Sequence, residues 1–141
     1  MKQRYKKQSG FTIVELIVVM AILALLAGIA GPRIMQVFSG ANTKAVKLQI
    51  KDLENSLDLY RLDIGHYPTD AEGGLKALVK GSGARWNGPY LKGKSIPLDS
   101  WGFTYHYANP SQHGGKFDVY SYGADNQAGG DGENADITSW E

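Results

Sequence analysis

The chain has 141 residues, a formal net charge of +1 and no cysteine, which excludes disulfides and thiolate chemistry. Residues 1–10 carry four basic residues and no acid, and without them the chain holds 11 Lys and Arg against 14 Asp and Glu. This small acidic excess argues against a nucleic-acid partner for residues 11–141.

An apolar block covers residues 11–32. Every residue from 16 to 30 is apolar or glycine, and as a helix, at about 1.5 Å per residue, the block is long enough to cross a bilayer core. The basic residues 1–10 are then expected to stay on the cytoplasmic side. The block can be a cleaved secretory signal with a small-residue site at 28–30, a plain membrane anchor, or a segment that begins in the membrane and later leaves it.

One carboxylate, that of Glu15, lies inside this block. An ionised acid in the bilayer core is costly unless it is paired. Neither a secretory signal nor a plain anchor gives the acid a purpose. A segment that later leaves the membrane does give it a purpose, if the carboxylate then pairs with a positive charge.

The residues Gly10, Phe11, Thr12 and Glu15 resemble the cleavage and assembly motif of type IV pilins and their relatives, the pseudopilins. The resemblance implies that a prepilin peptidase cuts between Gly10 and Phe11 and that the new N-terminus of Phe11 is methylated. The cut creates an α-amine, which Glu15 can neutralise on its own chain or on a neighbouring subunit. The resemblance favours the neighbour, and the pair would then set the axial register of a helical filament.

A second apolar pattern follows Pro32, at steps of 4, 3, 4, 3 and 4: Val46, Ile50, Leu53, Leu57, Tyr60 and Ile64. This spacing predicts an amphipathic helix that packs on a core and ends near Gly65. One long helix is therefore expected over residues 12–64. Pro32 either marks the end of the membrane segment or, as the resemblance favours, bends or locally melts the helix in a filament.

A small head is expected after the helix. Thr69 or Asp70 can cap a short helix that contains Leu75 and Leu78. Residues 103–107 and 116–122 predict two strands of an antiparallel hairpin. Two strands alone are only marginally stable, so they must pack on the amphipathic helix.

Further motifs narrow the resemblance to the major pseudopilin of type II secretion systems. They are Tyr67-Pro68-Thr69, Gly74-Leu75-x-Ala77-Leu78, Trp86-x-Gly88-Pro89-Tyr90-Leu91, Pro97-x-Asp99-x-Trp101-Gly102 and Ser121-x-Gly123-x-Asp125. The chain departs from the family at Ser100, where Pro is usual, and at Asn126, where Gly is usual. The resemblance implies an α+β, type IV pilin-like fold: a long N-terminal helix, hydrophobic in its first half, packed on a small antiparallel β-sheet head with a calcium-binding loop.

Residues 122–136 contain four acids spaced by glycines: Asp125, Asp131, Glu133 and Asp136. Ca²⁺ takes about six to eight oxygen ligands from carboxylates, backbone carbonyls and water. The spacing is not that of an EF-hand loop, and from the residues alone a solvated acidic loop is an open alternative.

The resemblance implies one calcium in this loop. The side chains of Asp125 and Asp136 match the family's ligands, and the carbonyls of Tyr122 and Gln127 are further candidates. Asp131 and Glu133 are less central. Asparagine tolerates the left-handed backbone conformation, so Asn126 is not expected to remove the site.

No enzymatic activity is expected, because the three histidines lie in separate segments and no nucleophile–base pattern stands out. The resemblance implies a structural subunit of a bacterial inner membrane, single-pass, with its head in the periplasm. Such subunits polymerise into a pseudopilus, which acts as a piston or screw for the export of folded proteins across the outer membrane. A major or minor pilin of a type IV pilus, serving adhesion or motility, is the alternative.

The implied partners are further copies of the chain in a helical filament, minor pseudopilins, the prepilin peptidase and an inner-membrane assembly platform. The expected division is a cleaved basic leader over residues 1–10, a transmembrane and filament-core helix over 11–32, and a periplasmic head over 33–141. The head includes the second half of the long helix.

Overall fold

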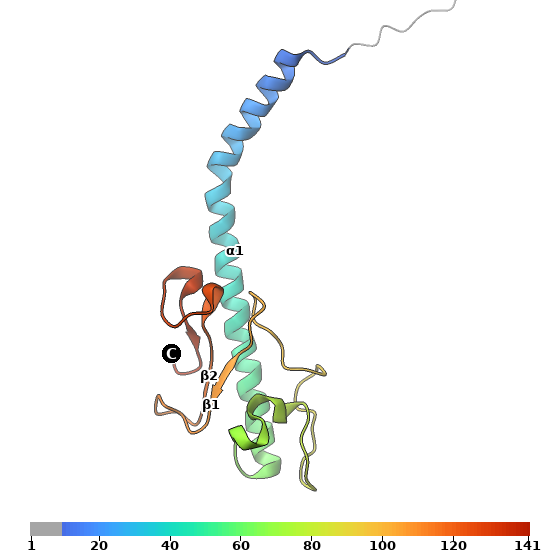
Figure 1. Cartoon of the computed structure of the whole chain (residues 1–141), viewed down its shortest axis with the longest axis vertical. Coiled ribbons are helices and arrows are strands. Elements are labelled where there is room, and N and C mark those ends of the chain that lie inside the picture. The colour runs from blue at the N-terminus through green and yellow to red at the C-terminus, as the bar shows by residue number, and fades with distance from the viewer. Residues whose placement is uncertain (1–9) are drawn as a thin grey trace, which may run out of the picture. The chain divides into compact units, whose positions relative to one another are not determined.

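In the computed structural model, which describes residues 10–141, one long helix precedes a small sheet and several short helical turns. Helix α1 spans Ile13–Ile64, as the sequence predicts. The chain divides into two compact units, Met1–Val37 and Phe38–Glu141, and α1 contributes to both (Figure 1). The expected basic leader, apart from Gly10, lies outside the described residues.

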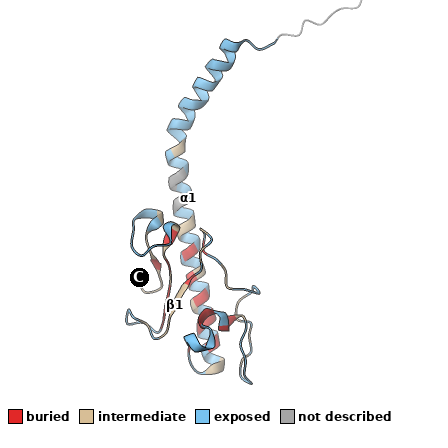
Figure 2. Ribbon diagram, in the orientation of Figure 1, coloured by how far each residue is buried: buried red, intermediate tan, exposed pale blue. Residues whose placement is uncertain are grey.

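In the first unit, the described part of α1 is apolar and exposed (Figure 2). Its segment Ile13–Ile34 is long and apolar enough to cross a membrane, and none of it is buried. Pro32 lies inside α1 and does not end the helix. A proline inside a helix removes one backbone hydrogen bond and leaves the helix locally weaker.

In the second unit, α1 supplies one face of the hydrophobic core. Val46, Leu53 and Leu57 are fully buried, Ile50 and Tyr60 nearly so. The last residue of the predicted stripe, Ile64, is partly buried against the same cluster. Burial of each such aliphatic side chain contributes about 1.5–3 kcal/mol. The stripe therefore holds the helix to the rest of the head, as the spacing predicts.

The segment after α1 turns at Gly65, whose φ is 100°, as the sequence predicts. The expected short helix is instead two 3₁₀-helices, η1 (Asp70–Glu72) and η2 (Gly74–Leu78). A capping box formed by Thr69 and Glu72 starts the first one. Gly73 and Gly74 have φ values of 97° and 56°, and these left-handed residues prevent a continuous α-helix.

The sheet has three antiparallel strands in the order β1–β2–β3. Strands β1 (His106–Ala108) and β2 (Asp118–Ser121) confirm the expected hairpin, although each is shorter than predicted, and His106 pairs with Tyr120. Strand β3 (Ile137–Thr138) adds a third strand that the sequence did not indicate, through pairing of Ile137 with Ser121. The acidic stretch thus forms a closed loop between β2 and β3, with η3 (Gly123–Asp125) and η4 (Gly132–Asn134) inside it.

Candidate functional site

The N-terminal motif sits at the start of α1. Gly10 and Phe11 precede the helix and are exposed, Phe11 by 88%. The peptide bond between them is therefore outside regular structure. A peptidase needs an accessible, unstructured bond, and this one satisfies that condition.

Thr12 and Glu15 form a reciprocal capping box. The Thr12 backbone amide donates to Glu15 Oε2 at 2.9 Å, and the Thr12 hydroxyl donates to the same oxygen at 3.1 Å. The Glu15 amide in turn donates to Thr12 Oγ1 at 3.2 Å. These bonds satisfy donors that every helix start leaves unpaired.

The capping box places the Glu15 carboxylate at the end of the helix where a cut after Gly10 would create the Phe11 amine. The pattern Thr-x-x-Glu is a sequence signature of such a box. The expected role of Glu15 rested on its charge in an apolar setting and did not include this local hydrogen bonding. The structure shows that the acid has a partner within its own chain before any assembly. An intersubunit pair would have to replace or share these hydrogen bonds.

The acidic loop is tied together by its own carboxylates. Asp125 Oδ1 accepts a hydrogen bond from the Gln127 amide at 3.1 Å, and Asp136 Oδ1 accepts one from the Gly129 amide at 3.0 Å. Both acids are thus turned toward the loop backbone. Asn126 has φ 53° and ψ 38°, the left-handed conformation expected to be tolerated at this position.

Two glycines allow close backbone approaches across the loop. A Cβ on Gly123 would lie 2.5 Å from the carbonyl oxygen of Glu133 and 2.9 Å from that of Ala135. A Cβ on Gly130 would lie 2.6 Å from the carbonyl oxygen of Asn134. Only glycine fits at such distances. Three successive carbonyl groups are therefore packed against glycines in the interior of the loop.

Some of the oxygen atoms in the loop are of the kinds that bind a hard cation such as Ca²⁺. Asp125 and Asp136 offer carboxylate oxygens, and the loop also supplies backbone carbonyl oxygens; both are ligand types that calcium takes. Within residues 10–141, however, no three acidic or histidine side chains converge as a metal cluster. Asn42 Nδ2 donates to Glu133 Oε1 at 3.4 Å, which turns that acid toward α1. A site built on all four acids is therefore not supported by the described residues.

The buried carboxylate of Asp99 anchors the start of the loop. Its Oδ1 accepts from the amides of Trp101 and Phe103, and its Oδ2 accepts from the Ser121 hydroxyl at 2.6 Å. Ser121 Oγ accepts from the Gly123 amide at 3.2 Å. This chain of bonds links the turn at 99–103 to the first residue of η3. The motifs around Asp99 and Ser121 are both recognisable in the sequence, but nothing in the sequence indicates that these two residues contact each other.

A second buried acid, Asp118, organises the connection between β1 and β2. Ser111 Oγ donates to its Oδ1, and the Gln112 amide and the His113 ring bind its Oδ2 at 2.8 and 2.9 Å. Burial raises the pKa of Asp118, but these hydrogen bonds outweigh burial and hold the pKa below its usual range.

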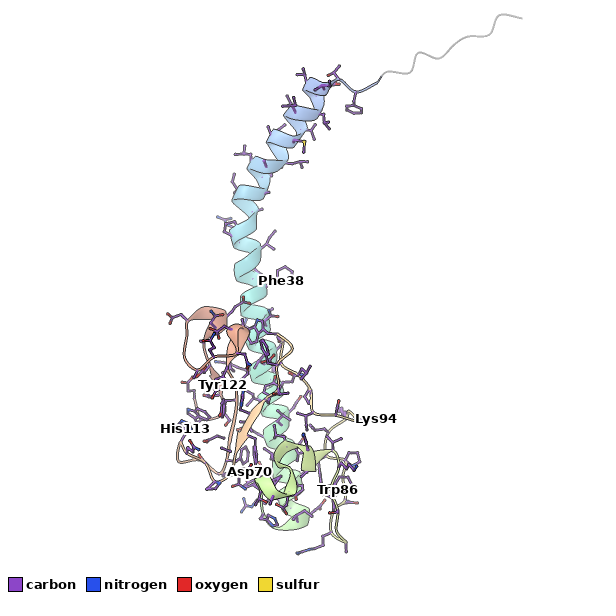
Figure 3. The ribbon with its side chains drawn as sticks, in the orientation of Figure 1. Phe38, Asp70, Trp86, Lys94, His113 and Tyr122 are labelled. Atoms are coloured by element: carbon purple, nitrogen blue, oxygen red, sulfur yellow. The ribbon has the colours of Figure 1, made fainter. Side chains whose placement is uncertain are left out.

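Serine, histidine and aspartate meet here without the geometry of a catalytic relay. Both Ser111 and His113 bind the Asp118 carboxylate, whereas a nucleophilic serine must bind the histidine ring. The His113 ring also stacks on Trp140, with centroids 3.7 Å apart. His113 and Tyr122, the residue before η3, lie on the same side of the second unit in Figure 3. The cluster holds the C-terminal end of the chain in place.

Comparisons with known families match both parts of the chain. Residues 33–140 match the family described as type II secretion system (T2SS), protein G. Residues 5–31 match the prokaryotic N-terminal methylation motif.

Relatives of known function are similar over nearly the whole chain. Type II secretion system core protein G of Pseudomonas aeruginosa is 40% identical, covering 96% of this chain and 97% of the relative. The protein of the same name from Vibrio cholerae is 39% identical, covering 98% and 95%. The crystal structure of the major pseudopilin from the type 2 secretion system of enterohaemorrhagic Escherichia coli superposes with a TM-score of 0.60 at 33% identity, covering 75% of this chain and 92% of that one.

Proposed function

The chain belongs to the type II secretion system protein G family, and from this we infer that it is a structural subunit, not an enzyme, that polymerises into the pseudopilus of such a system. The observation that carries this function is that one chain has both an exposed apolar helix over Ile13–Ile34 and a head similar to that of a major pseudopilin. Among the described residues this helix segment has no apolar partner, so it needs a membrane or other subunits. The match over residues 33–140 favours a pseudopilin over a type IV pilin of adhesion or motility, because that match lies in the head.

We propose that the precursor is cut between Gly10 and Phe11 by a prepilin peptidase and methylated on Phe11. The methylation-motif match over residues 5–31 and the exposed position of the bond support this processing. Mass spectrometry of the N-terminus of the mature protein tests it. A methylated Phe11 start is expected, and a start at Gly31 would show that the block is a secretory signal.

Before assembly, the mature subunit is proposed to sit in the bacterial inner membrane as a single-pass protein, with residues 33–141 in the periplasm. The single apolar segment among the described residues supports one crossing. Its assembly partners are proposed to be an inner-membrane platform, minor pseudopilins and further copies of the chain. The assembled filament then acts as the piston or screw that moves folded proteins through the outer membrane.

In the filament, Glu15 is proposed to pair with the Phe11 amine of a neighbouring subunit. The capping box supports this role, because it already directs the carboxylate to the helix start. Within an apolar filament core, an unpaired charge is costly, so a subunit out of register is disfavoured. The pair specifies axial position rather than adding much stability.

A calcium ion is proposed to bind the acidic loop through the side chains of Asp125 and Asp136 and through backbone carbonyls, with those of Tyr122 and Gln127 as candidates. Calcium would supply a cross-link between oxygen atoms that the chain itself cannot join. Asp131 and Glu133 stay outside this ligand set. The chain has no disulfide, and the loop contributes few apolar side chains to the core, so such a cross-link would stabilise it.

A further inference from the structure

One Asn-Gly pair occurs in the chain, Asn87-Gly88, in the segment between η2 and β1. Asn87 is exposed and belongs to no helix or strand. The carbon of an asparagine side-chain amide lies within reach of the backbone nitrogen of the next residue. A following glycine hinders attack by that nitrogen least, because it has no Cβ. Each of the other five asparagines precedes a residue with a Cβ, so Asn87 is the one most open to attack by its neighbour.

Packing requires the glycine at position 88. The Trp86 indole (Figure 3) donates a hydrogen bond from Nε1 to the carbonyl oxygen of Ala77 in η2, at 2.9 Å. A Cβ on Gly88 would lie 2.5 Å from the indole, and a Cβ on Gly81 would lie 2.2 Å from it. The ring is thus packed against two glycines, and a side chain at either position would displace it. The missing Cβ that the indole requires also leaves the Gly88 nitrogen unhindered.

The backbone nitrogen of Gly88 is not held by a hydrogen bond. Within residues 10–141, the Gly88 amide donates to no acceptor. The nearest amides before and after it are both bound: that of Asn87 donates to the Tyr90 hydroxyl at 3.0 Å, and that of Tyr90 donates to the Leu78 carbonyl oxygen at 2.8 Å. A hydrogen bond from Gly88 would have to break before its nitrogen could bond to carbon. The described fold places no such barrier at this residue.

We propose that Asn87-Gly88 is a site of spontaneous modification, at which the folded chain converts its asparagine to isoaspartate and aspartate. The Gly88 nitrogen bonds to Cγ of Asn87 and gives up its proton, the bond from Cγ to Nδ2 breaks, and ammonia leaves. Water then opens the succinimide ring at one of its two carbonyl carbons. Opening at the backbone carbonyl leaves Gly88 attached through Cγ, as isoaspartate, and opening at Cγ gives aspartate. Water is the one co-reactant.

Isoaspartate lengthens the main chain by one atom inside a turn that is held at both ends. Trp86 is bonded to η2, and the Tyr90 hydroxyl donates to Asp63 Oδ2 on α1 at 2.9 Å. The same hydroxyl accepts from the amide of Asn87, so a longer main chain at this residue displaces that amide. The turn over residues 86–90 is then less tightly bound to the end of α1. Aspartate adds a charge at an exposed position and leaves the main chain unchanged.

Incubation of the full chain in detergent micelles at neutral pH, followed by peptide mass spectrometry, tests the site. A mass increase of about 1 Da is expected at Asn87, because a hydroxyl group replaces the amino group. Labelling by a protein isoaspartyl methyltransferase identifies the isoaspartate product. Asn87→Gln is the matched control and should stay unchanged, because its longer side chain would have to close a larger ring. A synthetic peptide of residues 84–92, incubated alongside, gives the rate without the fold.

The proposal is wrong if Asn87 keeps its amide in the folded chain over the time in which the peptide is converted. Conversion of another asparagine as fast as Asn87 would equally overturn it, because the missing Cβ would then be irrelevant. The incubated chain should melt at a lower temperature than fresh chain, whereas fresh Asn87→Asp, which has the charge but not the longer main chain, should melt like the unsubstituted chain. Equal melting of incubated and fresh chain would contradict the loosening of the turn. None of these outcomes depends on filament assembly, so the proposed function stands or falls separately.

Discussion

Helix α1 has one continuous backbone and two different surroundings. Over Ile13–Ile34 its apolar side chains are exposed, whereas from Val46 to Tyr60 an apolar stripe is buried by the rest of the head. The second part finds its apolar partners within the chain. The first part finds none within residues 10–141, so its partners are lipid or other subunits. Folding and assembly therefore depend on separate residues, and substitutions should affect one without the other.

The largest effect is expected from Glu15→Leu. The substitution removes the one acid of the apolar block, so membrane insertion should be retained while filament formation is lost, because the Phe11 amine of a neighbour has no counter-charge. Membrane fractionation and electron microscopy of filaments check the two parts. Normal filaments from this variant would show that Glu15 serves the helix start alone.

Thr12→Ala is the matched control for Glu15→Leu. It breaks the capping box but keeps the carboxylate, at a cost of about 1 kcal/mol to the helix start. Filaments should still form. If both variants lose assembly equally, the cap rather than the charge is the important feature.

In the head, Leu57→Ala should lower the free energy of unfolding by about 2–5 kcal/mol, because it empties a fully buried site. Leu62→Ala, at an 81% exposed position of the same helix, should change it by less than about 0.5 kcal/mol. Chemical unfolding of the full chain in detergent micelles measures both. An equal loss in the two variants would contradict the view that the head is complete within one chain.

Removal of calcium should destabilise the head and leave the apolar segment unaffected. At a hundredfold excess of calcium over its Kd, a site in the folded state adds about 2.7 kcal/mol. EDTA should therefore lower the melting temperature of the full chain, and Asp125→Ala should lower it and abolish the response to EDTA. Asp70→Ala, outside the loop, should keep the response. No change of the melting temperature with EDTA would count against a calcium site.

The smallest effect concerns pH. The pKa of Asp118 is lower in the folded chain than in the unfolded one, so its carboxylate stabilises the fold above its unfolded pKa, near about 3.9. This contribution is lost as the pH falls from about 5 through the folded pKa. Asp118→Asn should cost about 1.5 kcal/mol at neutral pH and progressively less in acid. Unfolding at several pH values, with exposed Asp70→Asn as control, measures it. A pH-independent difference would exclude the charged hydrogen bonds as its cause.

The elements that could be predicted from the sequence are those with a local cause. The steps between Val46 and Ile64 require a helix with one buried face, and Gly65 ends it, because both depend on residues within a few turns. The hairpin of β1 and β2 was also visible, although its strands are shorter than the aromatic pattern suggests. The helix expected after Thr69 became two 3₁₀-helices because consecutive left-handed glycines interrupt it.

The acidic loop shows where sequence patterns stop being informative. Four acids close in sequence suggested a single cluster, but Glu133 turns to Asn42 on α1, and Asp125 and Asp136 bind amides of the loop itself. A two-residue strand such as β3 has too little pattern to be recognised. Its pairing with Ser121 depends on a partner sixteen residues away.

By itself, the sequence determined the apolar block, the long helix, its buried stripe and the Thr12–Glu15 signature, because helical periodicity and capping act over a few neighbouring residues. Only the tertiary structure decided that Asp99 reaches Ser121, that Gly123 admits the carbonyls of the distant loop residues, and that several leucines of α1 in the head are left exposed. These features depend on how distant segments fill the space around one another. Which face of α1 stays exposed is known only once the packing of the rest of the head on the other face is known.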